Sequence, residues 1–252
     1  KRGIVFNIRD GFQDMALQVP CGKCDGCRAQ RAQMWAIRMY HEASLHDQNS
    51  FLTLTYADAP PALVKEDLQK FFKRLRHDFK FRYFACGEYG EQTRRPHYHA
   101  VIFGQDFLGG AYQINDELYS NKKVEEVWGL GQIAIAPVTM ASCCYVAGYV
   151  NKKAGDTDTF NLMSRRPGIG SSWLDKYADD IKRTGTVTIE GKELPVPPRY
   201  LDWKEEELVD VKRARKARFD DMTPDERYER ACSLPAKEKV KKAQLKLRRK
   251  TI

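Results

Sequence analysis

The chain has 252 residues and a formal net charge of +9, and 42% of its residues are hydrophobic and 11% aromatic. This composition is typical of a globular protein with one large domain or two small ones, and it excludes a disordered chain. The positive charge favours a polyanionic partner such as nucleic acid, although many basic proteins bind none. No apolar run approaches the roughly 18 residues that a membrane span needs, so we expect neither membrane anchoring nor secretion. Because the sequence starts at Lys1 without a methionine or a signal-like segment, we expect further residues before it.

Three cysteines stand close together near the start of the chain, at Cys21, Cys24 and Cys27. Their spacing suits a structural zinc site whose fourth ligand is distant in the sequence, such as Cys86 or a histidine. An iron–sulfur cluster is a second interpretation, but Arg31 stands where the bacterial ferredoxin pattern has its fourth cysteine. Reduced thiols in a tight turn are a third interpretation, and one of these thiols could cap the following helix.

The hydrophobic pattern up to residue 136 predicts a series of helices and strands. The helix expected at residues 65–79 is the clearest, because its apolar residues share one face and its exposed face is basic. We expect strands at 4–8, 17–19, 51–56, 82–88, 97–103 and 132–136, helices at 25–46 and 65–79, and a long polar connection at 106–127 with a short helix near 121–128.

The strand expected at residues 97–103 carries the most informative pair of side chains, His97 and His99. Successive side chains alternate between the faces of a strand, so both imidazoles point to the same side. Two adjacent imidazoles are a natural pair of metal ligands, and Glu88 in the preceding strand of a predicted hairpin offers a carboxylate. These three ligands suit a catalytic ion with open coordination positions better than a closed zinc site. The alternative is two histidines that are hydrogen-bonded at a sheet surface.

A helix expected at residues 140–153 places Tyr145, Tyr149 and Lys152 on one face, largely turned away from its apolar stripe. A phenol is a poor nucleophile at neutral pH because its usual pKa is about 10, but a nearby cation favours the phenolate. The sequence therefore offers two potential nucleophiles beside an ammonium group. The alternative is a pair of packing tyrosines with a lysine that reaches towards solvent.

The sequence changes in character after residue 155, so we expect two domains: residues 1–155, which include the cysteine-rich segment, and a C-terminal extension at residues 156–252. A loop at residues 164–170 carries Arg165 and Arg166, and two guanidinium groups can bind phosphates or a base edge. Pairing of these arginines with surface acids is the alternative. The extension is further expected to contain a helix at 173–181, strands at 187–189 and 194–196, a proline-marked linker at 195–198, and a basic helical tail from 204 that is broken near 223–224 and at 235.

Together these motifs resemble the HUH endonucleases, a superfamily of rolling-circle replication initiators, relaxases and some transposases. A histidine–hydrophobe–histidine strand followed by a tyrosine-bearing helix is the signature of that superfamily. Residues 51–56 look like its first motif, and Glu88 stands where the family places its third metal ligand. Residues 21–27, 86–90 and 164–170 further resemble the replication initiators of the gokushoviruses, a branch of the microviruses.

The order of the predicted elements fits an α+β fold with a split βαβ plan, as in ferredoxin and RRM domains, in which an antiparallel sheet has helices on one face. The resemblance implies the same kind of fold with five strands in the central sheet, and the basic helical extension would follow it. The histidine pair would lie on the open face of the sheet, beneath the tyrosine helix.

The resemblance also implies an enzyme that nicks single-stranded viral origin DNA at a specific sequence and transfers the strand. Glu88, His97 and His99 would hold Mg²⁺ or Mn²⁺, and one tyrosine would form a 5′-phosphotyrosine link while Lys152 orients the phosphate. The other tyrosine would cut after one round of replication. A host helicase and a host polymerase would assist in the bacterial cytoplasm. We expect DNA contacts from Arg94, Arg95, Lys153, Arg165 and Arg166.

Two other functions stay open from the sequence alone. A plasmid initiator, a relaxase or a transposase of the same superfamily would use the same site, although a relaxase usually has three histidines. A DNA-binding protein without enzymatic activity would instead use the cysteine and histidine groups as structural zinc sites.

Overall fold

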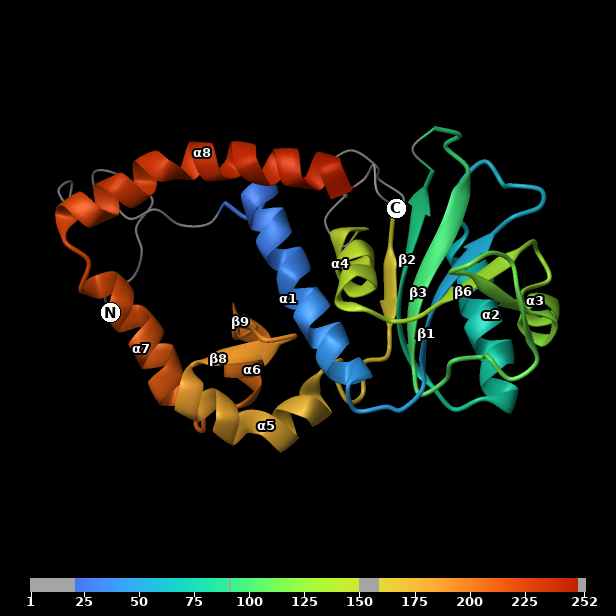
Figure 1. Cartoon of the computed structure of the whole chain (residues 1–252), viewed down its shortest axis with the longest axis horizontal. Helices are drawn as coiled ribbons and strands as arrows, with labels where there is room; N and C mark the ends of the chain where they lie inside the picture. Colours follow the sequence, from blue (N-terminus) through green and yellow to red (C-terminus); the bar gives the residue numbers. More distant parts are fainter. Residues whose placement is uncertain (1–20, 91, 150–158, 249–252) are drawn as a thin grey trace. The chain divides into compact units, whose positions relative to one another are not determined.

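A computed structural model describes residues 21–90, 92–149 and 159–248 (Figure 1). The chain divides into two compact units, of which the larger is Ala29–Asp220 and the smaller combines residues 1–28 with 221–252. The strands expected at 4–8 and 17–19 lie outside the described residues. The domain boundary expected at residue 155 stays a prediction.

The larger unit is built on a seven-stranded sheet in which every pair of neighbouring strands is antiparallel. This arrangement confirms the α+β class and the central antiparallel sheet. The expectation of five strands is wrong, because three-residue strands from the polar connection and from the segment after residue 158 also join the sheet. The order across the sheet is β4 (Ala111–Gln113), β5 (Tyr119–Asn121), β6 (Ile133–Ala136), β1 (Asn49–Thr55), β3 (Pro96–Phe103), β2 (Arg82–Tyr89) and β7 (Asn161–Met163).

One face of the sheet is covered by α2 (Lys65–Asp78) and α3 (Lys122–Trp128). Leu54, Tyr98 and Ile102 point to this side, because alternate residues of a strand share a face. The apolar stripe of α2 packs onto these side chains and is fully or almost fully buried. Burial of this stripe is the main reason that α2 lies where it does.

The opposite face is covered by α4 (Met140–Tyr149) and by the part of α1 (Asp25–Ala43) that belongs to the larger unit. Phe84 and Val101 of the sheet pack there against Met39 of α1 and Val146 of α4. The expectation of helices on one face only is therefore wrong. The physical reason is visible in β3, whose last five residues are all apolar and buried, so both of its faces need a cover.

The last part of the larger unit has a core of its own, which includes Ile37 of α1. The proline-marked linker expected at 195–198 is wrong, because Val196 and Tyr200 are fully buried in this core. Pro198 is the first residue of α6, a position where a proline costs no helical hydrogen bond. The elements here are α5 (Ser171–Thr184), β8 (Thr186–Ile189), β9 (Lys192–Pro195), α6 (Pro198–Trp203) and α7 (Val209–Asp220).

The smaller unit contains α8 (Pro224–Arg248). The break expected near 223–224 is confirmed, since α7 ends at Asp220 and α8 begins at Pro224. The break expected at Pro235 is wrong, because α8 continues through this residue. A proline removes one backbone hydrogen bond from a helix and kinks it, and here that local loss does not end the helix. No helix among the described residues is long and apolar enough to span a membrane.

His41 of α1 is a buried histidine whose titration should make the stability of the fold depend on pH. It is 2% exposed, its ring stacks on Trp173 at 3.5 Å, and its Nδ1 lies 3.0 Å from the hydroxyl of Tyr200. Burial lowers the pKa of His41 to about 3, because the charged imidazole loses its hydration. In the unfolded chain this group is protonated below its ordinary pKa of about 6.5, so acid favours unfolding.

We therefore expect the free energy of unfolding to fall by about 2 kcal/mol between pH 7 and pH 5 through His41 alone. Urea denaturation at the two pH values would measure this fall in the original chain and in the variants His41→Gln and His77→Gln. His41→Gln should lose that part of the pH dependence, and His77→Gln should retain it because its side chain is 88% exposed. An unchanged difference between pH 7 and pH 5 in His41→Gln would contradict the assignment.

Candidate metal and tyrosine site

Glu88, His97 and His99 come together through the register of the hairpin formed by β2 and β3. Glu88 lies directly opposite His97, and Cys86 lies opposite His99, so all three side chains share one face of the sheet. The Nε2 atoms of His97 and His99 lie 2.6 and 3.0 Å from the same carboxylate oxygen, Glu88 Oε1. The ligand atoms of the three residues all lie within 4.8 Å of one another, so this group could hold a metal ion.

The other nitrogen of each imidazole has a partner that orients the ring. His97 Nδ1 lies 3.2 Å from the carbonyl oxygen of Arg95, and His99 Nδ1 lies 3.0 Å from Thr53 Oγ1. A carbonyl oxygen can only accept, so in this contact Nδ1 of His97 carries the proton and Nε2 is available to a metal. Sequence reasoning missed Thr53. Its signal is its position in β1, where it pairs with His99 in register.

Glu88 is the electrostatic centre of this group and is 3% exposed. Burial on its own would raise the pKa of Glu88, but the hydrogen bonds and the charges of His97 and His99 outweigh it and hold the pKa at about 2. The carboxylate is therefore ionised at neutral pH. One anionic oxygen donor and two imidazole nitrogens form a donor set that suits a divalent cation.

The tyrosines of α4 lie at the same group. The hydroxyl of Tyr145 donates to Glu88 Oε1 at 3.2 Å and lies 3.5 Å from His99 Nε2. The ring of Tyr149 lies 5.0 Å from that of Tyr145 and 6.2 Å from the ring of His99. Burial, together with the negative charge of Glu88, raises the pKa of both hydroxyls above the ordinary value. Both phenols are thus neutral in this arrangement, and either of them needs a nearby cation to become a nucleophile.

The remaining residues predicted near this site are placed in part. Lys152 and Lys153 lie outside the described residues. The guanidinium of Arg94 lies 4.9 Å from the centre of the Tyr89 ring, and Arg95 donates to the carbonyl oxygens of Tyr56 and Ala57 at 2.8 and 2.9 Å. Arg95 thus joins the turn between β2 and β3 to the end of β1, and its contact with DNA stays a prediction.

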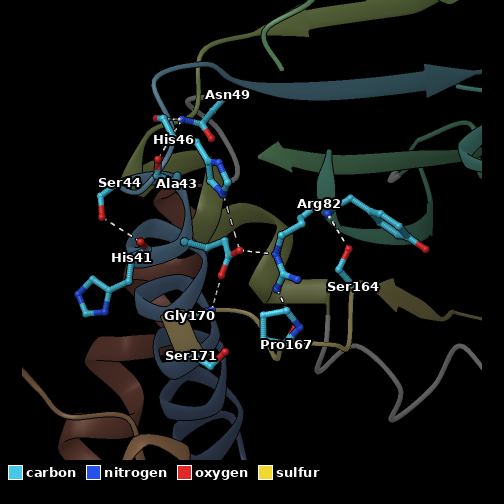
Figure 2. A network of polar contacts seen from close by, with 12 residues as sticks. His41, Ala43, Ser44, His46, Asn49, Arg82, Ser164, Pro167, Gly170 and Ser171 are labelled. Atoms are coloured by element: carbon cyan, nitrogen blue, oxygen red, sulfur yellow. Dashed lines mark hydrogen bonds and ion pairs between the residues drawn. The ribbon is translucent and has the colours of Figure 1, made fainter. Parts of the chain in front are cut away.

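Arg165 and Arg166 lie on a loop whose backbone is held in place by buried polar side chains (Figure 2). Glu42 of α1 accepts from the backbone N–H of Gly170 at 2.6 Å and from Nε of Arg82 at 2.5 Å. Arg82 also donates to the carbonyl oxygen of Pro167 at 2.8 Å. Both loop arginines are exposed, so the backbone is anchored while the two guanidinium groups face solvent.

This loop lies at the opposite end of β2 from the metal group. Ser164, at its start, donates its N–H to the carbonyl oxygen of Tyr83, next to the first residue of β2, whereas Glu88 is the last but one residue of that strand. Six residues of extended chain separate Arg82 from Glu88, a distance of about 20 Å. Arg165 and Arg166 are therefore not brought to the metal group.

Glu42 is the residue whose loss should loosen the loop most. In Glu42→Gln the buried Arg82 loses its counter-ion and the Gly170 N–H loses a charged acceptor, which should cost about 2 kcal/mol. Hydrogen exchange in a peptide covering residues 164–171 should then become about 30-fold faster, since 1.36 kcal/mol corresponds to a factor of ten. The exposed Asp179 gives a matched control, Asp179→Asn, which should leave this exchange unchanged. Equal exchange rates in the original chain and Glu42→Gln would contradict the anchoring role.

Cys21, Cys24 and Cys27 form a second group that could hold a metal ion, and it lies in the described part of the smaller unit. The backbone N–H groups of Cys24 and Lys23 donate to Cys21 Sγ and lower the pKa of this thiol to about 7. Cys86, which the sequence offered as a fourth ligand, is fully buried in the core of the larger unit. Its burial favours the role of a small packed core residue.

Comparisons with known proteins agree with this architecture. A family model of replication-associated proteins, the ORF2 family, matches residues 49–154, from β1 through the tyrosine helix. The chain is 32% identical to the replication-associated protein VP4 of Bdellovibrio phage phiMH2K, over 79% of this chain and 72% of the relative. It is 30% identical to the replication-associated protein ORF2 of Spiroplasma virus 4, over 76% and 71%, and 29% identical to ORF4 of Chlamydia phage 1, over 77% and 56%. No solved structure matches the chain significantly.

An antiparallel sheet that carries a Glu–His–His group beside a tyrosine-bearing helix defines an HUH-like protein. The chain belongs to the family of phage replication-associated proteins. The resemblance to the initiators of the gokushoviruses, drawn above from its motifs, is thereby confirmed.

Proposed function

We propose that this protein initiates rolling-circle replication of phage DNA by nicking and rejoining a single strand. One observation carries the proposal: the Tyr145 hydroxyl lies 3.2 Å from Glu88 Oε1, the oxygen that also contacts both imidazoles. A potential nucleophile therefore shares one small group of atoms with three potential metal ligands. The names of the relatives, which are replication-associated proteins of phages, support a role in replication.

Mg²⁺ or Mn²⁺ fits the donor set of one carboxylate and two imidazoles, which leaves coordination positions open. When bound, such an ion would polarise the scissile phosphate and stabilise the charge that develops on it. Thr53 and the carbonyl of Arg95 would keep the two imidazoles oriented for this task. Lys152 would orient the phosphate.

In the cleavage step, the phenolic oxygen of a tyrosine forms a bond to phosphorus while the bond from phosphorus to the 3′ oxygen breaks. The phenol loses its proton, and the departing 3′ oxygen gains one. The products are a 5′-phosphotyrosine and a free 3′-hydroxyl that a host polymerase could extend behind a host helicase. Because the phosphodiester energy is conserved in the covalent link, rejoining needs no ATP. Tyr145 is the better placed nucleophile for the first cut, and Tyr149 would make the second.

The DNA strand itself would be held by basic side chains, for which we propose Arg94, Arg95, Lys153, Arg165 and Arg166. Their contacts would be largely to phosphates, which position a strand without reading its sequence. The reaction would take place in the cytoplasm of the host bacterium, where the viral origin is single-stranded.

Detection of the covalent adduct tests the proposal directly. The chain is incubated with overlapping single-stranded oligonucleotides that tile the phage genome, with Mn²⁺ or with a chelator, and the products are run on a denaturing gel. We expect a slower protein band with one oligonucleotide and only in the presence of the ion. No adduct with any oligonucleotide, together with zinc that survives dialysis at the histidines, would favour the non-enzymatic alternative.

A further inference from the structure

The cysteine trio, meaning Cys21, Cys24 and Cys27, has a geometry that separates the three interpretations of its sequence. The Sγ atoms of Cys21 and Cys27 lie 3.9 Å apart, and all three Sγ atoms lie within 4.8 Å of one another. A disulfide would hold two sulfurs at about 2.05 Å, so these thiols are not bonded to each other. A tetrahedral zinc ion with Zn–S distances of about 2.3 Å places its sulfur ligands about 3.8 Å apart. The observed separation agrees with ligands of one ion.

Iron–sulfur clusters and unliganded thiols fit this geometry less well. In a cluster each thiolate binds a different iron, so the cysteine sulfurs are spread further apart than on one ion. Unliganded cysteines are usually buried as small apolar residues, whereas Cys21 and Cys24 are exposed and Cys27 is only half-buried. Burial of apolar surface therefore does not explain why three sulfurs converge here.

The surrounding backbone is arranged to stabilise negative charge on these sulfurs. The N–H groups of Lys23 and Cys24 point at Cys21 Sγ, at 3.4 and 3.2 Å. The carbonyl oxygen of Cys24 accepts from the N–H of Arg28, which is the first hydrogen bond at the start of α1, and Cys27 lies in the first turn. The N-terminus of a helix favours thiolates because its partial charge is positive.

We propose that Cys21, Cys24 and Cys27 bind one zinc ion through three thiolates. The group found among the described residues has three members, which leaves one position of a tetrahedral ion for a donor outside the trio. The ion closes the turn at residues 21–27 and fixes the start of α1. This site is separate from the Glu–His–His group and does not depend on the proposed nuclease activity.

The test measures metal content without any DNA. The full chain is purified without chelators and dialysed, and the bound metals are quantified by mass spectrometry. We expect about one zinc ion per chain, which Cys24→Ser or Cys27→Ser reduces at least tenfold. Cys232→Ser, at an exposed cysteine of the same unit, is the matched control and should retain the ion. His97→Ala/His99→Ala should retain it as well, which separates this site from the other group.

X-ray absorption keeps the proposal testable if a serine variant fails to fold. The zinc of the original chain should show three sulfur neighbours at about 2.3 Å. Zinc without sulfur neighbours, an iron cluster in place of zinc, or zinc content unchanged by Cys24→Ser and Cys27→Ser would each overturn the proposal.

Discussion

Replacement of both Tyr145 and Tyr149 by phenylalanine should abolish covalent attachment to DNA and leave DNA binding intact. The change removes two hydroxyl oxygens and keeps both rings, which pack against each other and against His99. Without a phenolic oxygen no bond to phosphorus can form, so we expect adduct formation to fall by about 10⁴-fold or more. A denaturing gel measures the adduct, and fluorescence anisotropy with the same oligonucleotide measures binding.

The single variants should differ from each other. Tyr145→Phe should lose most of the first cut, because its hydroxyl is the one that lies within hydrogen-bonding distance of Glu88 and His99. Tyr149→Phe should retain the first cut and lose closure of the displaced strand into a circle. Tyr228→Phe is the matched control, since this tyrosine of α8 is 71% exposed. An adduct that survives in the double variant would exclude both residues as nucleophiles.

Replacement of Glu88 by glutamine should remove metal binding and cleavage together. The variant keeps the size of the side chain but loses the negative charge that holds both imidazoles and that would bind the cation. A bound ion contributes several kcal/mol to stabilisation of the transition state, so cleavage should fall by about 10³-fold. Calorimetric titration with Mn²⁺ should show binding in the original chain and none in Glu88→Gln.

Two further measurements make this second result specific. Glu206→Gln, at an exposed position, should bind Mn²⁺ and cleave as the original chain does. If Glu88 were only a structural partner of the histidines, its replacement would lower the melting temperature and leave the Mn²⁺ titration unchanged. That outcome would contradict the metal site.

The candidate site could be predicted from the sequence because its signals are local. The alternation of side chains in a strand places His97 and His99 on one face, and the helical period places Tyr145 and Tyr149 on another. The short turn between β2 and β3 is enough to bring Glu88 opposite His97. Each of these inferences needs only a few neighbouring residues.

The features that the sequence did not reveal depend on distant partners. The three-residue strands β4, β5 and β7 are too short to show an alternating pattern, so only their pairing identifies them. The prolines near Val196 resemble those of a linker until the buried surroundings of Tyr200 are known. Glu42 and Gly170 are 128 residues apart, so no local pattern connects the loop to its anchor.

The position of the arginine loop has a consequence for the length of DNA that the protein would engage. A strand that touched both Arg165 and the Glu–His–His group would have to follow β2 from its first residue nearly to its last. Because β2 is a fixed length of extended backbone inside a sheet, it would act as a ruler between the point of contact and the point of cleavage. The spacing between two recognised nucleotides would then be built into the sheet itself.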